Sequence, residues 1–173
     1  VYSMRAFEIP EAQKTAKGRA MVNLLSLAQG EKITAIIPVS DRTNGYLVMA
    51  TRNGLIKKTS LRAFERINKN GKYAITLIDD DELIGVALSD GTNQILLASD
   101  SGRCIRFNES GVRAMGRTAK GVRAMRLQEG AKVVDMAIVD ENDYVLVVSE
   151  LGIGKRLKVS EIRRTARAGQ GVK

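Results

Sequence analysis

Short apolar runs separated by turns recur along this chain of 173 residues. Three stretches align with one another: YLVMATRNGLIKKTSL (46–61), QILLASDSGRCIRFNES (94–110) and YVLVVSELGIGKRLKVS (144–160). Each begins with an apolar run, passes through a short turn that holds one glycine, and ends in a second run rich in Lys and Arg. Such runs bounded by turn residues indicate β-strands. The pattern therefore predicts the same strand–turn–strand unit three times.

Two sets of glycines show that these units repeat. The turn glycines are 48 and 50 residues apart: Gly54, Gly102 and Gly152. A second set keeps nearly the same period, with spacings of 53, 50 and 50: Gly18, Gly71, Gly121 and Gly171. Because two independent landmarks share one period, internal repeats are predicted. We place them at residues 18–70, 71–120 and 121–170, with residues 1–17 as the remnant of a preceding unit, all in one domain over 1–173.

The second repeat contains four strand-like runs divided by turn signals: residues 73–78, 83–89, 94–99 and 103–107. Their apolar positions lack the 3.6-residue period of a helix. Only residues 60–67 look briefly helical. Four short strands in a unit of about 40–50 residues are typical of a propeller blade. The predicted fold class is all-β, a β-propeller-like architecture of four-stranded blades.

The chain is expected to form only part of a ring. Residues 1–9 look like the last strand of an earlier blade, and the terminal GQGVK run (169–173) begins another. About three repeats lie between them, whereas a closed propeller needs at least about four blades. We therefore expect about half of a ring, in a fragment that begins with Val1 rather than Met.

Composition excludes several kinds of chemistry. The chain is 44% hydrophobic but only 4% aromatic, with no Trp, so its core must be aliphatic. A single cysteine, Cys104, excludes a disulfide within the chain and fits a reducing compartment. Because the sequence has no His, Cys–His and Ser–His pairs and His-ligated zinc are excluded. No run is long enough to span a membrane, and no signal peptide opens the sequence.

An acidic run, Asp79–Glu82, is the one candidate cation site. It lacks the alternating ligand spacing and the glycine of a calcium loop, so we interpret it as a solvated turn. The sequence therefore offers no catalytic residue, no cofactor-binding residue and no metal ligand. A propeller enzyme gathers catalytic groups at its central channel, and no such set is visible.

The net charge of +9 is unevenly distributed. The segments 54–73, 102–123 and 152–173 hold 19 of the 28 basic residues and 3 of the 19 acidic residues. Residues 74–101, in contrast, hold six acids and no Lys or Arg. Equivalent positions of successive blades lie on one ring around a propeller, so this segregation predicts a basic belt along the perimeter. A charge spread for solubility alone would not follow the repeat.

A convex basic belt suits a stiff polyanion that bends around it, and duplex DNA fits best. Lys and Arg would neutralise phosphates with steep salt dependence and little sequence preference. Single-stranded nucleic acid is less favoured, because stacking platforms need aromatic residues and the three basic segments hold only Phe64, Tyr73 and Phe107. The candidate DNA-binding residues are Lys57, Lys58, Arg62, Arg66, Lys69, Lys72, Arg103, Arg106, Arg113, Arg117, Lys120, Arg123, Lys155, Arg156, Arg163, Arg164 and Arg167.

Long strings of the sequence resemble one known family. VYSMRAFEIPEA, AKGRAMVNLLSLAQGEKITAIIPV, YLVMATRNGLIKKTSL and GRTAKGVRAMRLQEGAKVVDMAIV are similar to the C-terminal domain of the A-type subunit of DNA gyrase, over essentially the whole chain. The A-type subunit of topoisomerase IV has the same domain with more degenerate blades, and the regular repeat here favours gyrase. The family's Q-R-R-G-G-K-G box is absent, and by the repeat register it would precede Val1. Looser echoes at 116–121 and 167–171 are not assigned its function.

The resemblance implies a β-pinwheel, a propeller whose blades exchange strands and which usually has six blades. It implies a non-catalytic module that wraps duplex DNA around its rim and presents it to the gyrase core. There, with the B-type subunit and with ATP and Mg²⁺ used by the holoenzyme, negative supercoils are introduced in the bacterial cytoplasm, at the nucleoid. The DNA-breaking tyrosine lies in another part of the A-type subunit, so none of the four tyrosines inherits its role. A propeller for protein–protein interaction remains the alternative from another class.

Overall fold

Three antiparallel hairpins form the framework of the molecule, where the strand–turn–strand units are predicted. The computed structural model describes residues 1–41 and 43–173. Gly54, in the first hairpin turn, has a φ of 80°, which a residue with a side chain adopts only under strain. The hairpins are β1 (Tyr46–Thr51) with β2 (Leu55–Ser60), β4 (Gln94–Ser99) with β5 (Cys104–Asn108), and β8 (Tyr144–Val148) with β9 (Gly154–Lys158).

A strand from the following repeat extends each of the first two hairpins. β3 (Leu83–Ser89) pairs with β1, and β7 (Val133–Val139) pairs with β4, both antiparallel. The sheet orders are β3-β1-β2-β6 and β5-β4-β7. The four strand-like runs of one repeat therefore do not share a sheet, because β3 pairs backward with β1 rather than forward with β4. Successive repeats are interleaved.

The outer edge of each of these sheets is closed by residues from still further along the chain. β6 (Val122–Arg123) pairs with the start of β2. In the second sheet, Val172 and Cys104 exchange two backbone hydrogen bonds of 2.8 Å. The GQGVK run, predicted to begin another blade, completes the sheet of β4 and β5 through Val172, just as β6 completes the sheet of β1 and β2.

Two predicted strands are absent. Residues 1–9 contain the 3₁₀ turn η1 (Ala6–Glu8) instead of a strand, because the Glu8 carboxylate accepts the Arg5 N–H at 2.8 Å and closes the backbone into a turn. Residues 73–78 join no sheet, since Thr76 bonds a loop, at the carbonyls of Thr118 and Ala119. Among the described residues between η1 and β1 there is one further 3₁₀ turn, η2 (Met21–Asn23).

The core is mainly aliphatic, as the composition predicts, with Phe107 as an aromatic member, and it joins the two larger sheets. Its centre is formed by side chains from both sheets and from the loops that cover them: Val48, Ile56, Ile95, Leu97, Ile105, Phe107, Met125 and Met136. β3 and β7 pack closely, since a Cβ added to Gly85 would lie 3.0 Å from the Cβ of Met136. The β8–β9 hairpin contributes little, and Leu146, Val147 and Val148 stay exposed.

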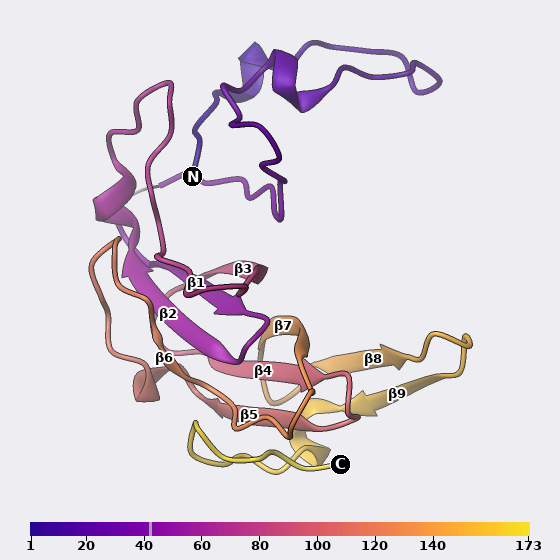
Figure 1. Cartoon of the computed structure of the whole chain (residues 1–173). Coiled ribbons are helices and arrows are strands. Elements are labelled where there is room, and N and C mark those ends of the chain that lie inside the picture. Colours follow the sequence, from indigo (N-terminus) through magenta and orange to yellow (C-terminus); the bar gives the residue numbers. More distant parts are fainter. Residues whose placement is uncertain (42) are drawn as a thin grey trace.

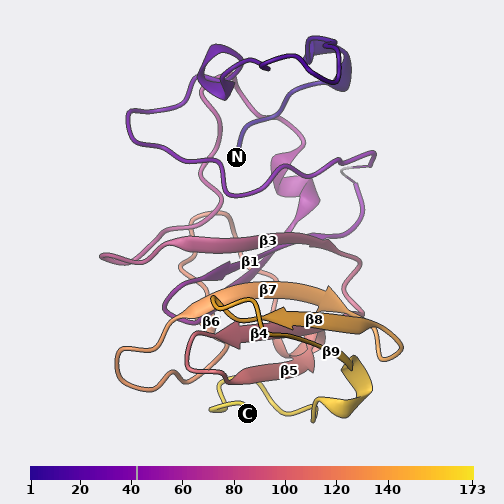
Figure 2. The same cartoon turned by 90° about the vertical axis from the view of Figure 1, so that its right-hand side faces the viewer.

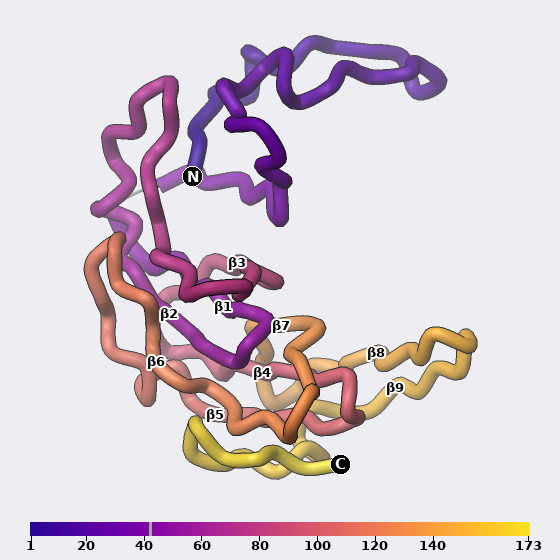
Figure 3. Tube along the Cα trace, viewed as in Figure 1, coloured from indigo at the N-terminus to yellow at the C-terminus, as the bar shows by residue number. Residues whose placement is uncertain are grey.

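The chain is curved into an open arc. Figure 1 shows the N-terminal arm at one end of the arc and the β8–β9 hairpin at the other. β3 and β7 lie toward the inner side, and β2, β5, β6 and the C-terminal segment lie toward the outer side (Figures 1 and 3). The view turned by 90° shows the strands of the two sheets stacked over one another (Figure 2). The all-β, propeller-like prediction is confirmed.

Candidate nucleic-acid interface

Three perimeter loops follow the second strands of the hairpins, at residues 61–71, 109–121 and 159–171. Each begins with a 3₁₀ turn: η3 (Leu61–Phe64), η4 (Glu109–Gly111) and η5 (Val159–Glu161). The short helical expectation for 60–67 is met by η3. One apolar side chain near the start of each loop is buried and anchors it: Phe64, Val112 and Ile162. The rest of each loop is free to carry polar residues on the surface.

The second and third perimeter loops arch back over the preceding hairpin. In the second, Ala114 forms an isolated parallel β-bridge with Lys58, and the Met115 N–H donates to the Lys58 carbonyl at 2.8 Å. In the third, the Thr165 N–H donates to the Arg106 carbonyl at 2.8 Å. β6 and Val172 then form the far ends of the two loops. The same geometry occurs twice, so the loops occupy equivalent places on the outer side of the arc (Figure 1).

Ten of the seventeen predicted DNA-binding residues are exposed. They lie in the three perimeter loops, in β6 and in β9: Arg62, Arg66, Lys69, Arg113, Lys120, Arg123, Lys155, Arg156, Arg163 and Arg164. Among the acids of the same segments, Glu65 and Glu161 are exposed and Glu109 is buried. The exposed charge of the loops is therefore predominantly positive in every repeat.

Four predicted residues are partly buried, and three of them use their guanidinium groups to fasten the loops. Arg117 Nη1 donates to the Tyr73 carbonyl at 3.5 Å, and Arg103 Nη1 donates to the Gly171 carbonyl at 3.3 Å. Arg167 donates through Nε to the Gly111 carbonyl at 2.9 Å and through Nη1 to the Arg123 carbonyl at 2.8 Å. In the fourth, Lys72, the backbone carbonyl accepts a hydrogen bond of 2.8 Å from the N-terminal ammonium of Val1.

Three predicted residues, Lys57, Lys58 and Arg106, do not belong to the exposed belt. Their side chains are buried because β2 and β5 are covered on both faces, so alternation along the strand leaves no solvent side. Arg106 pairs with Glu141 at 3.4 Å, and Lys58 pairs with Glu109. These charges are neutralised or bonded inside the protein, and they are not placed to contact phosphate.

Lys57 is the most deeply buried of the three, with 0% of the residue exposed. Its ammonium donates to the carbonyls of Ala74 and Arg117. Burial, and secondarily the charge of Arg117, lowers the pKa of Lys57 to about 8. Both effects disfavour the protonated amine.

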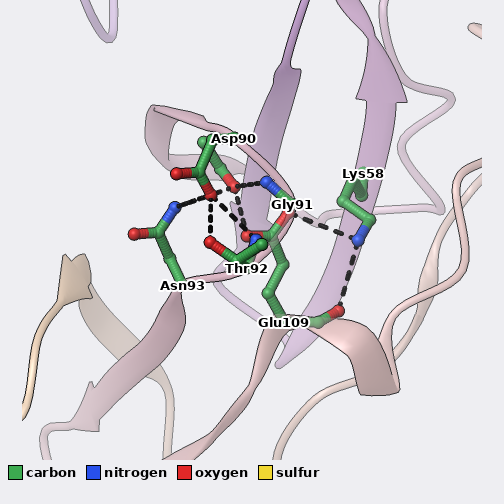
Figure 4. A network of polar contacts seen from close by, with 7 residues as sticks. Lys58, Asp90, Gly91, Thr92, Asn93 and Glu109 are labelled. Atoms are coloured by element: carbon green, nitrogen blue, oxygen red, sulfur yellow. Dashed lines mark hydrogen bonds and ion pairs between the residues drawn. The ribbon is translucent and has the colours of Figure 1, made fainter.

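Lys58 and Glu109 form a buried polar network that joins the two larger sheets. Lys58 Nζ lies 3.3 Å from Glu109 Oε1 and 4.9 Å from the centroid of the Tyr46 ring. Ser89, at the end of β3, donates its hydroxyl to Glu109 Oε2, and the Glu109 N–H donates to the Asn93 carbonyl at 2.9 Å. Figure 4 shows Lys58 and Glu109 facing each other beside the turn of residues 90–93. Strand β2 of one sheet is thereby tied to the loop that leaves the other.

The acids sit mainly in turns that they stabilise themselves. Asp41 accepts the side-chain and backbone donors of Thr43, and Asp90 accepts those of Thr92. These hydrogen bonds hold the pKa of both carboxyls below the ordinary Asp range. In the Asp79–Glu82 turn, Asp81 is buried and accepts the Asn53 N–H at 2.9 Å. Within residues 1–41 and 43–173, no group of three or more His, Cys, Asp or Glu could hold a metal ion.

The link that Glu109 and Ser89 make between the sheets was not predicted from the sequence, in which Glu109 is simply one of the three acids of the basic segments. The burial of Glu109, though not its partners, could have been predicted from its place in the repeat. An acid directly after a strand, at the position that Leu61 and Val159 fill in the other hairpins, is expected to be buried and therefore to need a cation.

In the part of the chain that the structure describes, none of the helical turns has the length and apolar character that a membrane-spanning helix requires.

Comparisons with known proteins agree with this geometry. A family model described as the DNA gyrase C-terminal domain, a beta-propeller, matches residues 1–40, 45–90, 93–140 and 143–173. The A-type subunit of DNA gyrase from Escherichia coli (strain K12) is 53% identical over 137 residues, which are 79% of this chain and 16% of that protein. The same subunit from Haemophilus influenzae is 48% identical over 128 residues, which are 73% of this chain and 14% of that protein. The chain thus spans less than a fifth of these relatives.

Two solved structures share the fold. A C-terminal domain of DNA topoisomerase IV superposes with a TM-score of 0.87 at 31% identity, covering 96% of this chain and 52% of that one. A DNA gyrase A C-terminal domain superposes with a TM-score of 0.80 at 32% identity, covering 91% of this chain and 53% of that one. With a family model matched along nearly its whole length, the chain belongs to the DNA gyrase C-terminal domain family.

Proposed function

We propose that this chain binds duplex DNA without sequence preference and bends it around the outer side of the arc. The observation that carries the proposal is the repetition of exposed Lys and Arg on three successive perimeter loops. Bending 20–30 bp by 40–90° costs on the order of 1–6 kcal/mol, so contacts must be spread over several repeats to offset it. The loops provide this distribution, because each repeat adds its own exposed basic residues to the same edge.

Within a complete enzyme, the wrapped segment would be delivered to a DNA-cleaving core for supercoiling driven by ATP. The names of the sequence relatives support this role, because those relatives belong to DNA gyrase. ATP, Mg²⁺, the B-type subunit and the rest of the A-type subunit belong to that larger assembly, and the proposed site of action is the bacterial cytoplasm, at the nucleoid. The chain itself acts as a non-catalytic binding module.

The binding test is a fluorescence titration of a random 30-bp duplex across a salt series. We expect the logarithm of the association constant to fall linearly with the logarithm of the salt concentration, with a slope of about −0.9 per phosphate neutralised. Replacing Arg113 and Lys120 with Ala should weaken binding and make that slope shallower by about two. Binding that ignores salt would overturn the DNA proposal and favour a protein-interaction propeller.

A matched control is available at Lys132, which is exposed and lies outside the perimeter loops, before β7, where its N–H donates to Asp100 Oδ1 at 2.9 Å. Lys132→Ala therefore removes the same charge as Lys120→Ala from another part of the surface. We expect Lys132→Ala to change affinity much less than Lys120→Ala. Equal losses from the two variants would show that net charge, and not the perimeter, governs binding.

A role in topoisomerase IV is the second candidate, because a domain of that enzyme superposes with the higher of the two TM-scores. The two enzymes are separated by activity. In a gyrase whose A-type subunit carries this chain, DNA supercoiling with ATP supports the gyrase role. Decatenation without supercoiling supports the role in topoisomerase IV.

A further inference from the structure

The second perimeter loop makes backbone contacts with β2 at two points, one on each side of a single residue. At one end, Ala114 and Met115 contact the backbone of Lys58, and at the other, Val122 pairs with Ile56 in the β2–β6 ladder. We call residues 114–122 the middle arch. Lys57 lies between these two contact points, so its side chain is covered by the middle arch.

The Lys57 side chain fills this position as a support. Its ammonium donates to the Arg117 carbonyl in the arch and to the Ala74 carbonyl in the adjoining segment. That segment is itself tied to the arch, because Thr76 donates through Oγ to the Thr118 carbonyl at 2.7 Å. None of the ion pairs found among residues 1–41 and 43–173 includes Lys57, so its charge is held by carbonyl dipoles alone.

The third perimeter loop provides an internal comparison that lacks this support. This loop makes its backbone contacts with Arg106 and Cys104, and the residue between them is Ile105. Ile105 is the counterpart of Lys57, because Ile105 pairs with Leu97 in its hairpin as Lys57 pairs with Met49. This loop is held from other positions: the Ala168 N–H donates to the Ala124 carbonyl at 2.6 Å, and the partly buried Arg103 and Arg167 donate to backbone carbonyls. A fully buried cation at the residue between the two contacts is therefore not required to build an arch.

The nearby charge that acts on Lys57 is positive. Arg117 faces it from the arch, and its charge adds to burial in lowering the pKa of Lys57. Lys72 and Tyr73 precede Ala74 on the adjoining segment. Lys58, the neighbour on β2, points to the other side and is neutralised by Glu109. A polyanion laid over the arch would therefore stabilise the protonated ammonium.

We propose that Lys57 is a positioning residue for DNA, an internal support whose positive charge holds the middle arch in the shape that presents Arg113, Lys120 and Arg123 to phosphates. Lys57 itself never touches DNA. The proposal rests on the proposed DNA-binding function. It predicts that DNA binding and the protonation of Lys57 favour one another, as linkage requires.

The experiment measures duplex affinity for the wild type, Lys57→Met and Lys120→Met from pH 7 to 9.5, at one ionic strength, with folding checked by circular dichroism. Wild-type affinity should fall about threefold over this range, which corresponds to a pKa rise of about half a unit on binding. Lys57→Met should bind about threefold to tenfold more weakly at pH 7 and lose this pH dependence. Lys120→Met, which removes a direct contact, should weaken binding but keep the pH dependence.

A wild-type affinity that stays constant from pH 7 to 9.5 overturns the proposal, and so does a folded Lys57→Met protein with the wild-type Kd and pH profile. If Lys57→Met does not fold, NMR of ¹⁵N-labelled lysine in the wild type decides. The pKa of Lys57 must then rise by about half a unit when the duplex is added, and an unchanged pKa overturns the proposal. If the wild type shows no salt-dependent binding, the DNA-binding function itself fails, which is a separate result.

Discussion

The buried pair of Lys58 and Glu109 makes a strong prediction about what holds the two larger sheets together. The Lys58 side chain is 8% exposed and that of Glu109 is 0% exposed, so water cannot replace a lost partner. Removing one partner of a buried pair costs about 3–5 kcal/mol. In Glu109→Leu, the backbone carbonyl of residue 109 and the Tyr46 ring still face the ammonium, so the expected loss is at the lower end of this range, about 3 kcal/mol.

The prediction is tested by urea unfolding followed by circular dichroism. A loss of about 3 kcal/mol is a large part of the roughly 5–15 kcal/mol that stabilises a typical domain, so the midpoint should fall clearly. Adding Lys58→Met removes the unpaired charge and should restore stability to within about 1 kcal/mol of the wild type. Glu82→Leu breaks an exposed pair with Arg52 and should cost at most about 1 kcal/mol. The reasoning is refuted if Glu109→Leu costs no more than Glu82→Leu, or if the losses in the double variant add.

Three further predictions concern the second and third perimeter loops and Lys57 beneath the middle arch. Gly121→Ala places a Cβ 2.7 Å from the Ile56 carbonyl oxygen at a φ of 99°, so it should lower the unfolding midpoint more than Gly130→Ala, where φ is 75° and nothing lies within 4 Å. Ala168 has a φ of 65°, so Ala168→Gly should stabilise by about 0.5–1 kcal/mol in the same assay, and a loss would contradict the strain. Because the folded pKa of Lys57 lies below its unfolded value, the folded protein binds fewer protons between about pH 8 and 10.5 and stability rises with pH there. Relative to Lys57→Met, the wild type should gain about 2 kcal/mol from pH 7 to 9.5 in urea unfolding, and parallel profiles would refute the lowered pKa.

The hairpins and their period were predictable from sequence because both are local properties. An apolar run, a glycine turn and a basic run lie within sixteen or so residues, and their repetition removes chance matches. The pairing of β3 with β1 was not predictable from the residues. Both β1 and β4 offer β3 an apolar neighbour of similar length, and sequence order favours the wrong one.

The basic belt was predictable as a distribution of charge but not residue by residue. Lys57 and Lys58 look like surface residues in a strand, and alternation would expose at least one of them. The structure buries both, because the arch covers one face of β2 and the turn that follows β3 covers the other. That cover comes from residues 89–122, far along the chain, so no window around Lys57 reveals it.

Interleaved sheets also set the timing of folding during synthesis. The first sheet begins with Tyr46 and is complete only at Arg123, and the second begins with Gln94 and is complete only at Val172. At about 5–20 residues per second, a ribosome needs about 4–15 s to make the rest of each sheet after its first residue. During that time a finished hairpin has both edges unpaired at first, and one edge unpaired once β3 or β7 has been made. The nascent chain therefore always carries one incomplete sheet behind the ribosome, and the next repeat, as it is translated, protects the one before it from aggregation.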